Sequence, residues 1–175
     1  MEKLQAEGFC IFHNILTLEE CAFQIASMDT LFANTEDMDG AEIEKYDKLR
    51  INKPEISDLV LSRIANHIDT SGIYLRTKWS LTRYITGGML DVHIDGNSYD
   101  DSKPSSYTLL VYLNNNFTGG RTVFVDNYDK SASTSNVFIT PEPGMVLLLK
   151  QDKLHYAEEV YSGCKYIMRS DIFHK

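Results

Sequence analysis

Cysteine is scarce in this chain, which has only Cys10, Cys21 and Cys164 among its 175 residues. No two of them form a Cys-x-x-Cys pair, so the sequence supplies neither a disulfide framework nor the paired thiolates of a zinc knuckle. Free thiols are usual in a reducing compartment. We therefore expect a cytoplasmic protein whose cysteines are buried as small apolar residues.

Positive charge and long apolar runs are also lacking. Seventeen Lys and Arg residues stand against 25 Asp and Glu residues, which gives a formal net charge of -8 and a pI near 5.0. Nucleic acids and anionic membrane surfaces need a positive field, so we expect neither as a partner, and a basic substrate is favoured. No stretch approaches the ~20 apolar residues of a membrane span. The oligomeric state stays open.

The length and the 43% apolar content predict one domain with a core of its own. We expect residues 1–175 to form this single domain. Residues 1–72 would be a helical support region, and residues 73–175 a β-rich core. The opening residues show no apolar run with a cleavage site, so we expect no secretory leader.

The start of the chain predicts a strand followed by a helix. Residues 8–16 have the composition of a short strand. Thr17 and Glu20 then have the T-x-x-E spacing of a capping box, which opens a helix that we expect to end near Phe32.

A second helix is expected after an acidic segment. The stretch 34–48 has no clean period, so we expect a loop there. Pro54 suits a first helical turn, and the apolar residues that follow it recur at the helical spacing as far as Ile68.

From residue 73 onward the pattern changes to short β-type runs separated by turn residues. Eight such runs in about a hundred residues favour an antiparallel sandwich or jelly roll. The runs are residues 73–85, 89–95, 107–114, 121–126, 136–140, 145–149, 155–161 and 165–173.

Two histidines and one aspartate form the strongest chemical pattern in the chain. His93 and Asp95 are separated by one residue, and His155 follows 62 residues after His93. Strand alternation puts residues i and i+2 on one face, about 6.6 Å apart, so that both can bind one ion. Two imidazoles and one carboxylate are the protein ligands of the Fe(II) facial triad, which leaves positions open for other ligands. We expect these three residues to be metal ligands and to be required for catalysis.

Further motifs surround this triad. They are Arg83-Tyr84, the His-Ile-Asp-Gly run at 93–96, YTLLVYLN ending at Asn114, GGRTVF at 119–124, PEPGMVLLL at 141–149, and His155 followed ten residues later by Lys165. In this order they resemble the Fe(II)/2-oxoglutarate dioxygenases, and within them the prolyl 4-hydroxylase-like group. The resemblance covers about residues 79–173, and Arg-Ile-Asn at 50–52 adds a looser match.

The resemblance implies a fold and a set of cofactors. The fold is α+β and mainly β: a double-stranded β-helix (jelly roll, cupin-like) with N-terminal helices packed on one sheet and the metal site in its core. The metal is Fe(II), the co-substrates are 2-oxoglutarate and O2, and ascorbate is the expected reductant. These components predict oxygenase chemistry.

The same resemblance implies binding residues for 2-oxoglutarate. Burying its distal carboxylate requires a cation and neutral donors. Lys165 is expected to pair with that carboxylate, Tyr112 to donate a hydrogen bond to it, and Tyr84 to lie against the co-substrate. Strand alternation places Arg169 on the face of Lys165, so Arg169 is expected to contact the co-substrate, the substrate or an acid such as Asp171.

The implied activity is hydroxylation of an unactivated C–H bond, with release of succinate and CO2. Asp95 favours hydroxylation over halogenation, because related halogenases leave that position empty for chloride. The expected substrate is a prolyl residue in a peptide or protein. The acidic segments 34–48 and 96–106 suit a basic peptide, but they equally suit loops that are kept soluble by charge.

Three alternatives remain open at the level of the sequence. The first is a hydroxylase of a free amino acid or small metabolite on the same fold, since a fold does not determine a substrate. The second is a non-catalytic metal-binding cupin-like domain. The third is a zinc hydrolase that uses the same two histidines and aspartate.

Overall fold

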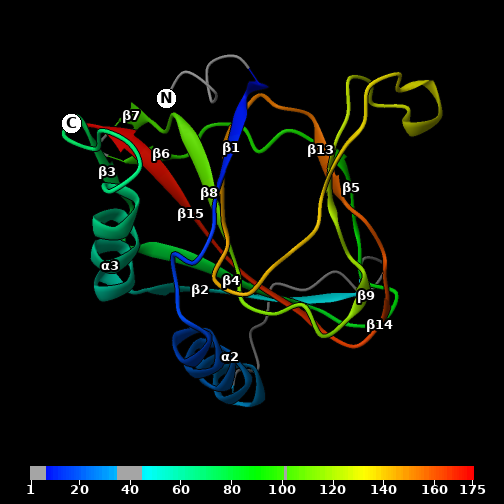
Figure 1. The fold of residues 1–175 in the computed structure, drawn as a ribbon, viewed down its shortest axis with the longest axis horizontal. Helices are drawn as coiled ribbons and strands as arrows, with labels where there is room; N and C mark the ends of the chain where they lie inside the picture. Colours follow the sequence, from blue (N-terminus) through cyan, green and yellow to red (C-terminus); the bar gives the residue numbers. More distant parts are fainter. Residues whose placement is uncertain (1–6, 35–44, 101) are drawn as a thin grey trace.

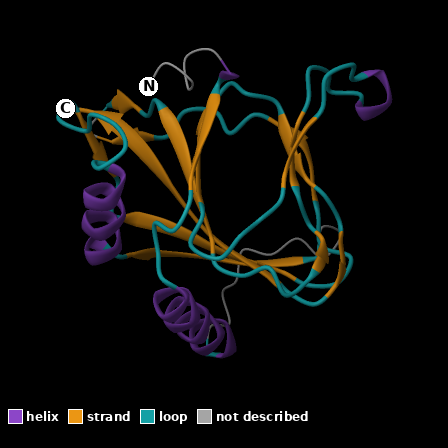
Figure 2. Cartoon of the chain, viewed as in Figure 1, coloured by secondary structure: helices purple, strands orange, loops and turns teal. Residues whose placement is uncertain are grey.

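The computed structural model describes residues 7–34, 45–100 and 102–175. Two antiparallel sheets face one another, and the helices lie against the larger sheet (Figure 1). Strands and loops make up most of the chain (Figure 2). The expected α+β, mainly β jelly roll with N-terminal helices on one sheet is confirmed.

The larger sheet has seven strands and joins the two ends of the chain. Its neighbouring strands are, in order, β1 (Phe9–Phe12), β12 (Val146–Lys150), β8 (Tyr107–Tyr112), β15 (Lys165–His174), β4 (Lys78–Tyr84) and β2 (Tyr46–Asn52), and β3 (Ile73–Leu75) pairs with the far end of β15. The central strand β8 is buried along its whole length, which explains why its sequence is apolar on both faces.

The smaller sheet has four strands and contains both predicted metal-ligand strands. Its order is β11 (Val137–Ile139), β10 (Thr122–Phe124), β13 (His155–Ala157) and β5 (Leu90–His93). Two short ribbons complete the β structure: β9 (Thr118–Gly119) with β14 (Val160–Ser162), and β6 (Tyr99–Asp100) with β7 (Lys103–Pro104). A 3-10 turn, η1, covers Lys130–Ala132.

Two helices follow the predicted signals. α2 (Leu18–Ala33) begins with the capping box, because Thr17 Oγ1 accepts from the Glu20 backbone N–H at 3.1 Å and the Glu20 carboxylate accepts from the Thr17 N–H at 2.8 Å. α3 (Pro54–Ile64) has proline in its first turn.

The helices are joined by an ion pair. Arg63 of α3 donates to both carboxylate oxygens of Glu20, at 2.6 and 2.8 Å, and also to the Ile15 carbonyl at 2.7 Å. These hydrogen bonds hold the pKa of Glu20 at about 2, well below its ordinary value of 4.5.

Replacing Glu20 with glutamine is expected to lower the free energy of unfolding by about 1–2 kcal/mol near pH 7. A carboxyl group with a depressed folded pKa stabilises the fold above its unfolded pKa, and that contribution is lost as the pH falls. The difference from wild type should therefore shrink between pH 4.5 and about pH 2. Urea unfolding of wild type and variant, near pH 7 and again near pH 2, measures this difference in the free energy of unfolding. Glu19→Gln, at an exposed position, is the control. Equal destabilisation at both pH values would contradict the pairing.

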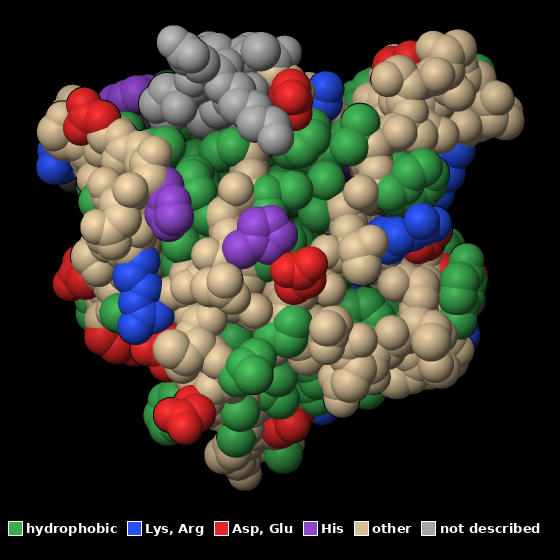
Figure 3. All heavy atoms as spheres, in the orientation of Figure 1, with side chains coloured by type: hydrophobic (Ala, Val, Ile, Leu, Met, Phe, Trp, Pro, Cys, Tyr) green, Lys and Arg blue, Asp and Glu red, His purple; other side chains and the backbone are tan. Residues whose placement is uncertain are grey.

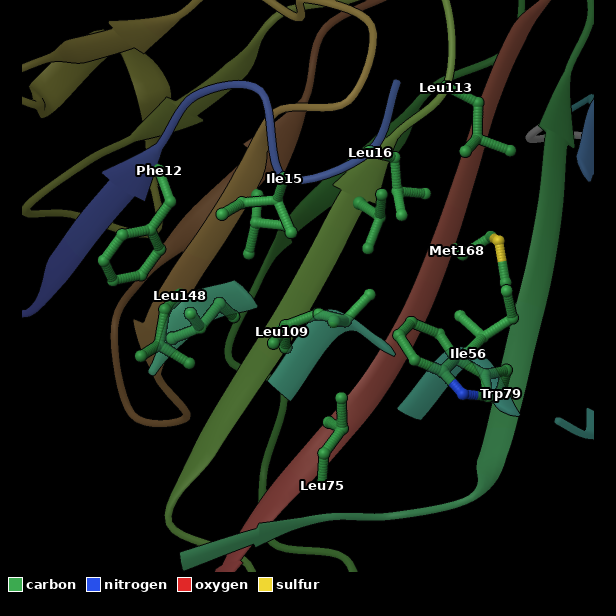
Figure 4. Packing of buried hydrophobic residues seen from close by; sticks show 14 of the residues in the cluster. Phe12, Ile15, Leu16, Ile56, Leu75, Trp79, Leu109, Leu113, Leu148 and Met168 are labelled. Atoms are coloured by element: carbon green, nitrogen blue, oxygen red, sulfur yellow. The ribbon is translucent and has the colours of Figure 1, made fainter. Parts of the chain in front are cut away.

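The larger sheet separates two apolar clusters. The outer cluster packs helix residues such as Ile56 of α3 against the sheet residues Trp79 and Leu109 (Figure 4). Trp79 is fully buried, and its indole N–H donates to Ser57 Oγ at 2.9 Å. The inner cluster lies between the two sheets and contains Tyr84, Tyr112 and Phe124 among its buried residues. Strand alternation thus leaves the inner face available for a site between the sheets.

Some boundaries differ from the expectations. The predicted loop 34–48 is wrong at its end, because residues 46–48 belong to β2; residues 35–44 of it lie outside the described residues. In β2, polar residues on the inner face alternate with the apolar Leu49 and Ile51 on the outer face. This is a strand pattern, but the acidic residues that precede it in the sequence made it hard to recognise. α3 ends at Ile64 instead of continuing to Ile68. The run 73–85 is divided into β3 and β4.

Smaller features complete the description. Cys10 and Cys21 are buried, whereas Cys164 is only half-buried, and all three are free thiols. Within the described ranges, no helix combines the length and apolarity needed to cross a membrane. On the face drawn in Figure 3, basic side chains are interspersed with acidic and uncharged ones, so that face carries no continuous basic strip for a phosphate backbone.

Candidate metal and co-substrate site

The two predicted histidines lie side by side on neighbouring strands. His155 on β13 is directly opposite His93 on β5, and their ring centroids are 4.3 Å apart. Asp95 follows the end of β5. The candidate ligand atoms of all three residues lie within 4.8 Å of one another. The structure therefore brings together the three residues that the sequence predicted as ligands.

Backbone contacts fix the tautomer of both imidazoles. His93 Nδ1 lies 2.7 Å from the Asp91 carbonyl oxygen, and His155 Nδ1 lies 2.9 Å from the Lys153 carbonyl oxygen. A carbonyl oxygen can only accept, so each Nδ1 carries the proton and each Nε2 keeps its lone pair. Histidines that bind metals usually donate their other ring N–H to such an acceptor.

Burial keeps one imidazole neutral. His155 is 5% exposed, and burial is the main cause that lowers its pKa below the ordinary value of 6.5, while nearby Asp95 acts in the opposite direction. A neutral ring is the form that binds a metal.

Asp95 has one oxygen engaged and one without a partner. Oδ1 lies 3.3 Å from Arg169 Nη2. Oδ2 is buried and has no hydrogen-bond partner in the described structure. A buried carboxylate oxygen without a donor is costly, and a cation bound beside it would remove that cost. Two imidazoles and this carboxylate thus fit Fe(II) both in donor type and in the unfilled oxygen.

A small cavity of about 240 Å³ opens beside the triad, between the two sheets. Among the described residues, the lysine, arginine and carboxylate side chains of its lining are Lys48, Lys165, Arg169 and Asp95. The lining residues are Tyr46, Lys48, Thr82, Tyr84, Leu90, His93, Asp95, Leu110, Thr122, His155, Tyr156, Ala157, Lys165, Ile167 and Arg169. The cavity therefore suits a small anionic ligand.

Lys165 is the buried cation of this cavity. It is 1% exposed, and its ammonium donates to the Gly120 carbonyl at 2.7 Å. It also lies over the rings of Tyr84 and Tyr112, at 5.3 and 5.6 Å from their centroids. Burial lowers the pKa of Lys165 to about 7, and the charge of Glu158 only partly opposes this. In the described part of the chain no carboxylate forms an ion pair with it.

The two predicted tyrosines differ in position. Tyr84 lines the cavity from β4, where it is paired in register with Lys165. Tyr112 is fully buried and is not among the described lining residues; its hydroxyl forms a 2.6 Å hydrogen bond with Thr122 Oγ1. Thr122 does line the cavity. Tyr112 thus meets the cavity indirectly, through the Thr122 hydroxyl and through the ammonium of Lys165 that lies over its ring.

Arg169 lines the cavity at its metal end. Besides Asp95, its Nη2 lies 3.2 Å from Asp171 Oδ1 and donates a long, 3.3 Å hydrogen bond to Thr108 Oγ1. Its Nε is buried and makes no hydrogen bond to any described residue. The ion pair with Asp171 that the sequence allowed is therefore present, and a second pair with a predicted metal ligand accompanies it.

Sequence reasoning missed several lining residues. Thr122 lies on β10 within the GGRTVF motif, and Thr82 lies on β4 two residues before Tyr84. Tyr46 and Lys48 lie on the missed strand β2, in register with Tyr84 and Thr82. Strand alternation counted from Tyr84 would have found Thr82, whereas β2 could not be aligned without knowing its partner strand.

The second acidic segment does not line the cavity. None of its described residues is among the lining, and Ser98 Oγ donates to Asp171 Oδ2 at 2.7 Å. Asp100 accepts from the Tyr74 hydroxyl at 3.1 Å. These contacts hold the described part of residues 96–106 against β3 and β15. Its acidity therefore gives no support to a basic substrate.

Comparison with known proteins identifies the family. A family model described as the 2OG-Fe(II) oxygenase superfamily matches residues 79–170, which is more than half of the chain. The chain belongs to this superfamily. The matched range contains the triad, Lys165 and Arg169. No curated protein sequence matches this oxygenase.

Solved structures share the fold at low identity. A prolyl-4-hydroxylase from Pseudomonas putida has a TM-score of 0.74 and 14% identity, covering 99% of this chain and 96% of that one. A prolyl hydroxylase from Trichoplax adhaerens, solved with a hypoxia inducible factor peptide fragment, has a TM-score of 0.69 and 20% identity, covering 99% and 86%. The alpha ketoglutarate dependent carbocyclase SnoK from nogalamycin biosynthesis has a TM-score of 0.76 and 15% identity, covering 99% and 82%.

Family membership and site geometry agree on the cofactors. This oxygenase is an Fe(II)- and 2-oxoglutarate-dependent enzyme, and its candidate iron ligands are His93, Asp95 and His155. The comparisons establish the chemistry of the family and the fold. They do not choose among its substrates, because solved relatives with different activities share this fold at similar identity.

Proposed function

We propose that this oxygenase hydroxylates an unactivated C–H bond of a prolyl residue in a peptide or protein, with release of succinate and CO2. The observation that carries the proposal is one small cavity with the histidine and aspartate triad at one end and the buried Lys165 at the other. A dicarboxylic co-substrate needs both an open metal and a cation, and the family uses 2-oxoglutarate.

Each residue has a defined role in this proposal. His93, Asp95 and His155 bind Fe(II), which when bound supplies the activation of O2 that side chains lack. Lys165 pairs with the distal carboxylate of 2-oxoglutarate, and Tyr84 lies against the co-substrate. Tyr112 acts through the Thr122 hydroxyl that it holds at 2.6 Å. Arg169 completes these surroundings at the metal end.

The apolar wall of the cavity also contributes. Leu110, Ile167 and Ala157 line it beside the charged groups. These side chains limit the water that reaches the metal, and a dry site strengthens the pairing of Lys165 with a carboxylate. Ascorbate is the proposed external reductant.

Prolyl hydroxylation is supported by the neighbours in fold. The Pseudomonas and Trichoplax enzymes are both prolyl hydroxylases, and each covers nearly all of this chain. A peptide substrate would approach the triad beside His93, whose side chain is 29% exposed, because Lys165 is buried.

Hydroxylation of a free amino acid or small metabolite is the second candidate. Two observations favour it: the similarity to SnoK, and a cavity lining in which Lys48 and Arg169 join Lys165 while Asp95 is the one acid among the described lining residues. Such a lining attracts small acids and repels basic side chains. The expectation of a basic substrate therefore has no support from the cavity itself.

Anaerobic titration tests the proposed chemistry. Adding Fe(II) and 2-oxoglutarate together is expected to produce a visible charge-transfer band that neither gives alone, because the band requires both to bind at one site. A non-catalytic domain or a zinc hydrolase would remain colourless while folded. In air, proline-containing peptides and a pool of amino acids and small acids are then compared. The proposal expects a peptide product heavier by one oxygen atom, and such a product from the small-molecule pool alone would favour the second candidate.

A further inference from the structure

Arg169 forms a bridge between two carboxylates, and one of them is a candidate metal ligand. Its Nη2 lies 3.3 Å from Asp95 Oδ1 and 3.2 Å from Asp171 Oδ1. No hydrogen bond to Asp95 comes from any described residue, and the other neighbours of its carboxylate are the two histidine Nε2 atoms, at 3.9 and 4.0 Å. Arg169 is therefore the contact that can orient the Asp95 carboxylate.

Asp171 anchors the other side of the bridge. It is 5% exposed, and its Oδ2 accepts from Ser98 Oγ at 2.7 Å. Its Oδ1 also accepts from Gln151 Nε2 at 3.4 Å, and Arg76 lies 3.9 Å from Oδ2. A carboxylate held from several directions cannot follow Arg169 if it moves. The nitrogen that faces Asp95, Nη2, is consequently held in place by Asp171.

Asp95 needs such a partner because its backbone is beyond the strand. β5 ends at His93, so no ladder hydrogen bond fixes the residue that bears the carboxylate. A carboxylate free to rotate would present either oxygen to a metal. The arginine engages Oδ1, and Oδ2 is left buried without a partner.

We propose that Arg169 is a positioning residue, which holds Asp95 Oδ1 and so leaves Oδ2 as the oxygen that would bind a metal. The inference rests on the metal site of the proposed function and adds a residue to its outer shell. Arginine suits the task because the one nitrogen that meets both carboxylates, Nη2, is part of a rigid planar guanidinium, whereas a lysine ammonium is a point charge on a flexible stem. Outer-shell partners of this kind are typically worth a factor of 10–100 in metal affinity or activity.

Two substitutions separate orientation from charge. Arg169→Lys keeps the positive charge and loses the rigid planar guanidinium, while Arg169→Met removes both. Each is titrated with Mn(II) alone, without co-substrate or O2, and free Mn(II) is followed by electron paramagnetic resonance. The proposal expects the dissociation constant to rise by about 10–100-fold in both variants.

A role of charge alone gives a different pattern. If Arg169 only tuned the local field, the lysine variant would bind Mn(II) like wild type, and the methionine variant would bind more tightly because a cation beside the divalent ion has been removed. If Arg169 only stabilised the fold, the melting temperature would fall while the Mn(II) affinity of the folded protein stayed unchanged. Either pattern overturns the proposal. Arg63→Lys is the matched control, since Arg63 is also ion-paired but lies on the outer helix α3.

A second titration separates positioning from direct contact with the co-substrate. At saturating Mn(II), positioning leaves the 2-oxoglutarate affinity of Arg169→Lys within about threefold of wild type. A loss of more than about tenfold there, with unchanged Mn(II) affinity, assigns Arg169 to the co-substrate and overturns the inference. Failure of the wild-type protein to bind Mn(II) would instead refute the metal site itself, and both proposals with it.

Discussion

Replacing Asp95 with alanine is expected to reduce succinate formation by more than about 100-fold, beyond the loss seen when only an outer-shell partner is removed. The variant loses one of three candidate ligands, and the two imidazoles that remain offer no negative charge to the divalent ion. It also leaves Arg169 close to the metal with Asp171 as its one ion-pair partner among the described residues. An unbalanced cation there opposes metal binding further.

Succinate is measured with Fe(II), 2-oxoglutarate and ascorbate present, with and without peptide. Asp58→Ala is a suitable control, because it removes an exposed carboxylate from the outer helix α3 and should retain full activity. Circular dichroism must show that both variants are folded. If folded Asp95→Ala formed succinate at the wild-type rate, Asp95 would not be a metal ligand, and the proposed triad would be wrong.

Two of the three candidate metal ligands could be placed together from the local sequence, and the third could not. His93 and Asp95 share a face by local alternation, so their proximity follows from any strand that contains them. His155 is different, because its position opposite His93 depends on the register between β13 and β5, a long-range pairing. Motif order supplied that prediction through the family resemblance, and residue spacing alone could not.

The surroundings of Arg169 show where prediction stopped. Alternation placed it on the face of Lys165, which the shared cavity lining bears out. Asp171 lies two residues further along β15 and was among the predicted partners, whereas Asp95 follows β5 of the other sheet, and only the packing of one sheet on the other brings it to Arg169. The lining residue Lys48 could not be found for a related reason, since β2 pairs with β4 across a long stretch of intervening sequence. Contacts that depend on tertiary packing are not visible in the local sequence pattern.

Replacing Lys165 with methionine is expected to weaken 2-oxoglutarate binding by about 100-fold or more. The substitution keeps much of the side-chain volume and removes the cation, and a charged pair whose partner is deleted in a buried site typically loses 2–5 kcal/mol. The dissociation constant is measured anaerobically through the charge-transfer band. Lys103→Met, on the exposed ribbon strand β7, controls for the loss of any lysine. Unchanged affinity would show that the distal carboxylate binds elsewhere.

The same lysine predicts how co-substrate affinity depends on pH. Burial lowers the pKa of Lys165 to about 7, and a bound carboxylate favours the ammonium form. Affinity should therefore be constant below about pH 7 and weaken up to tenfold per pH unit above it, because binding must then be accompanied by uptake of a proton. Lys165→Arg stays charged throughout and should flatten this profile.

Lys165 also predicts an effect on stability without co-substrate. A base whose folded pKa is depressed makes the fold less stable when it is protonated, so stability should rise with pH from about 7 towards the unfolded value of 10.5. Lys165→Met should abolish that rise and increase the melting temperature near pH 7, while weakening 2-oxoglutarate binding. Thermal unfolding across this pH range measures both effects. A wild-type profile that is flat above pH 7 would mean that the ammonium is already paired in the free enzyme.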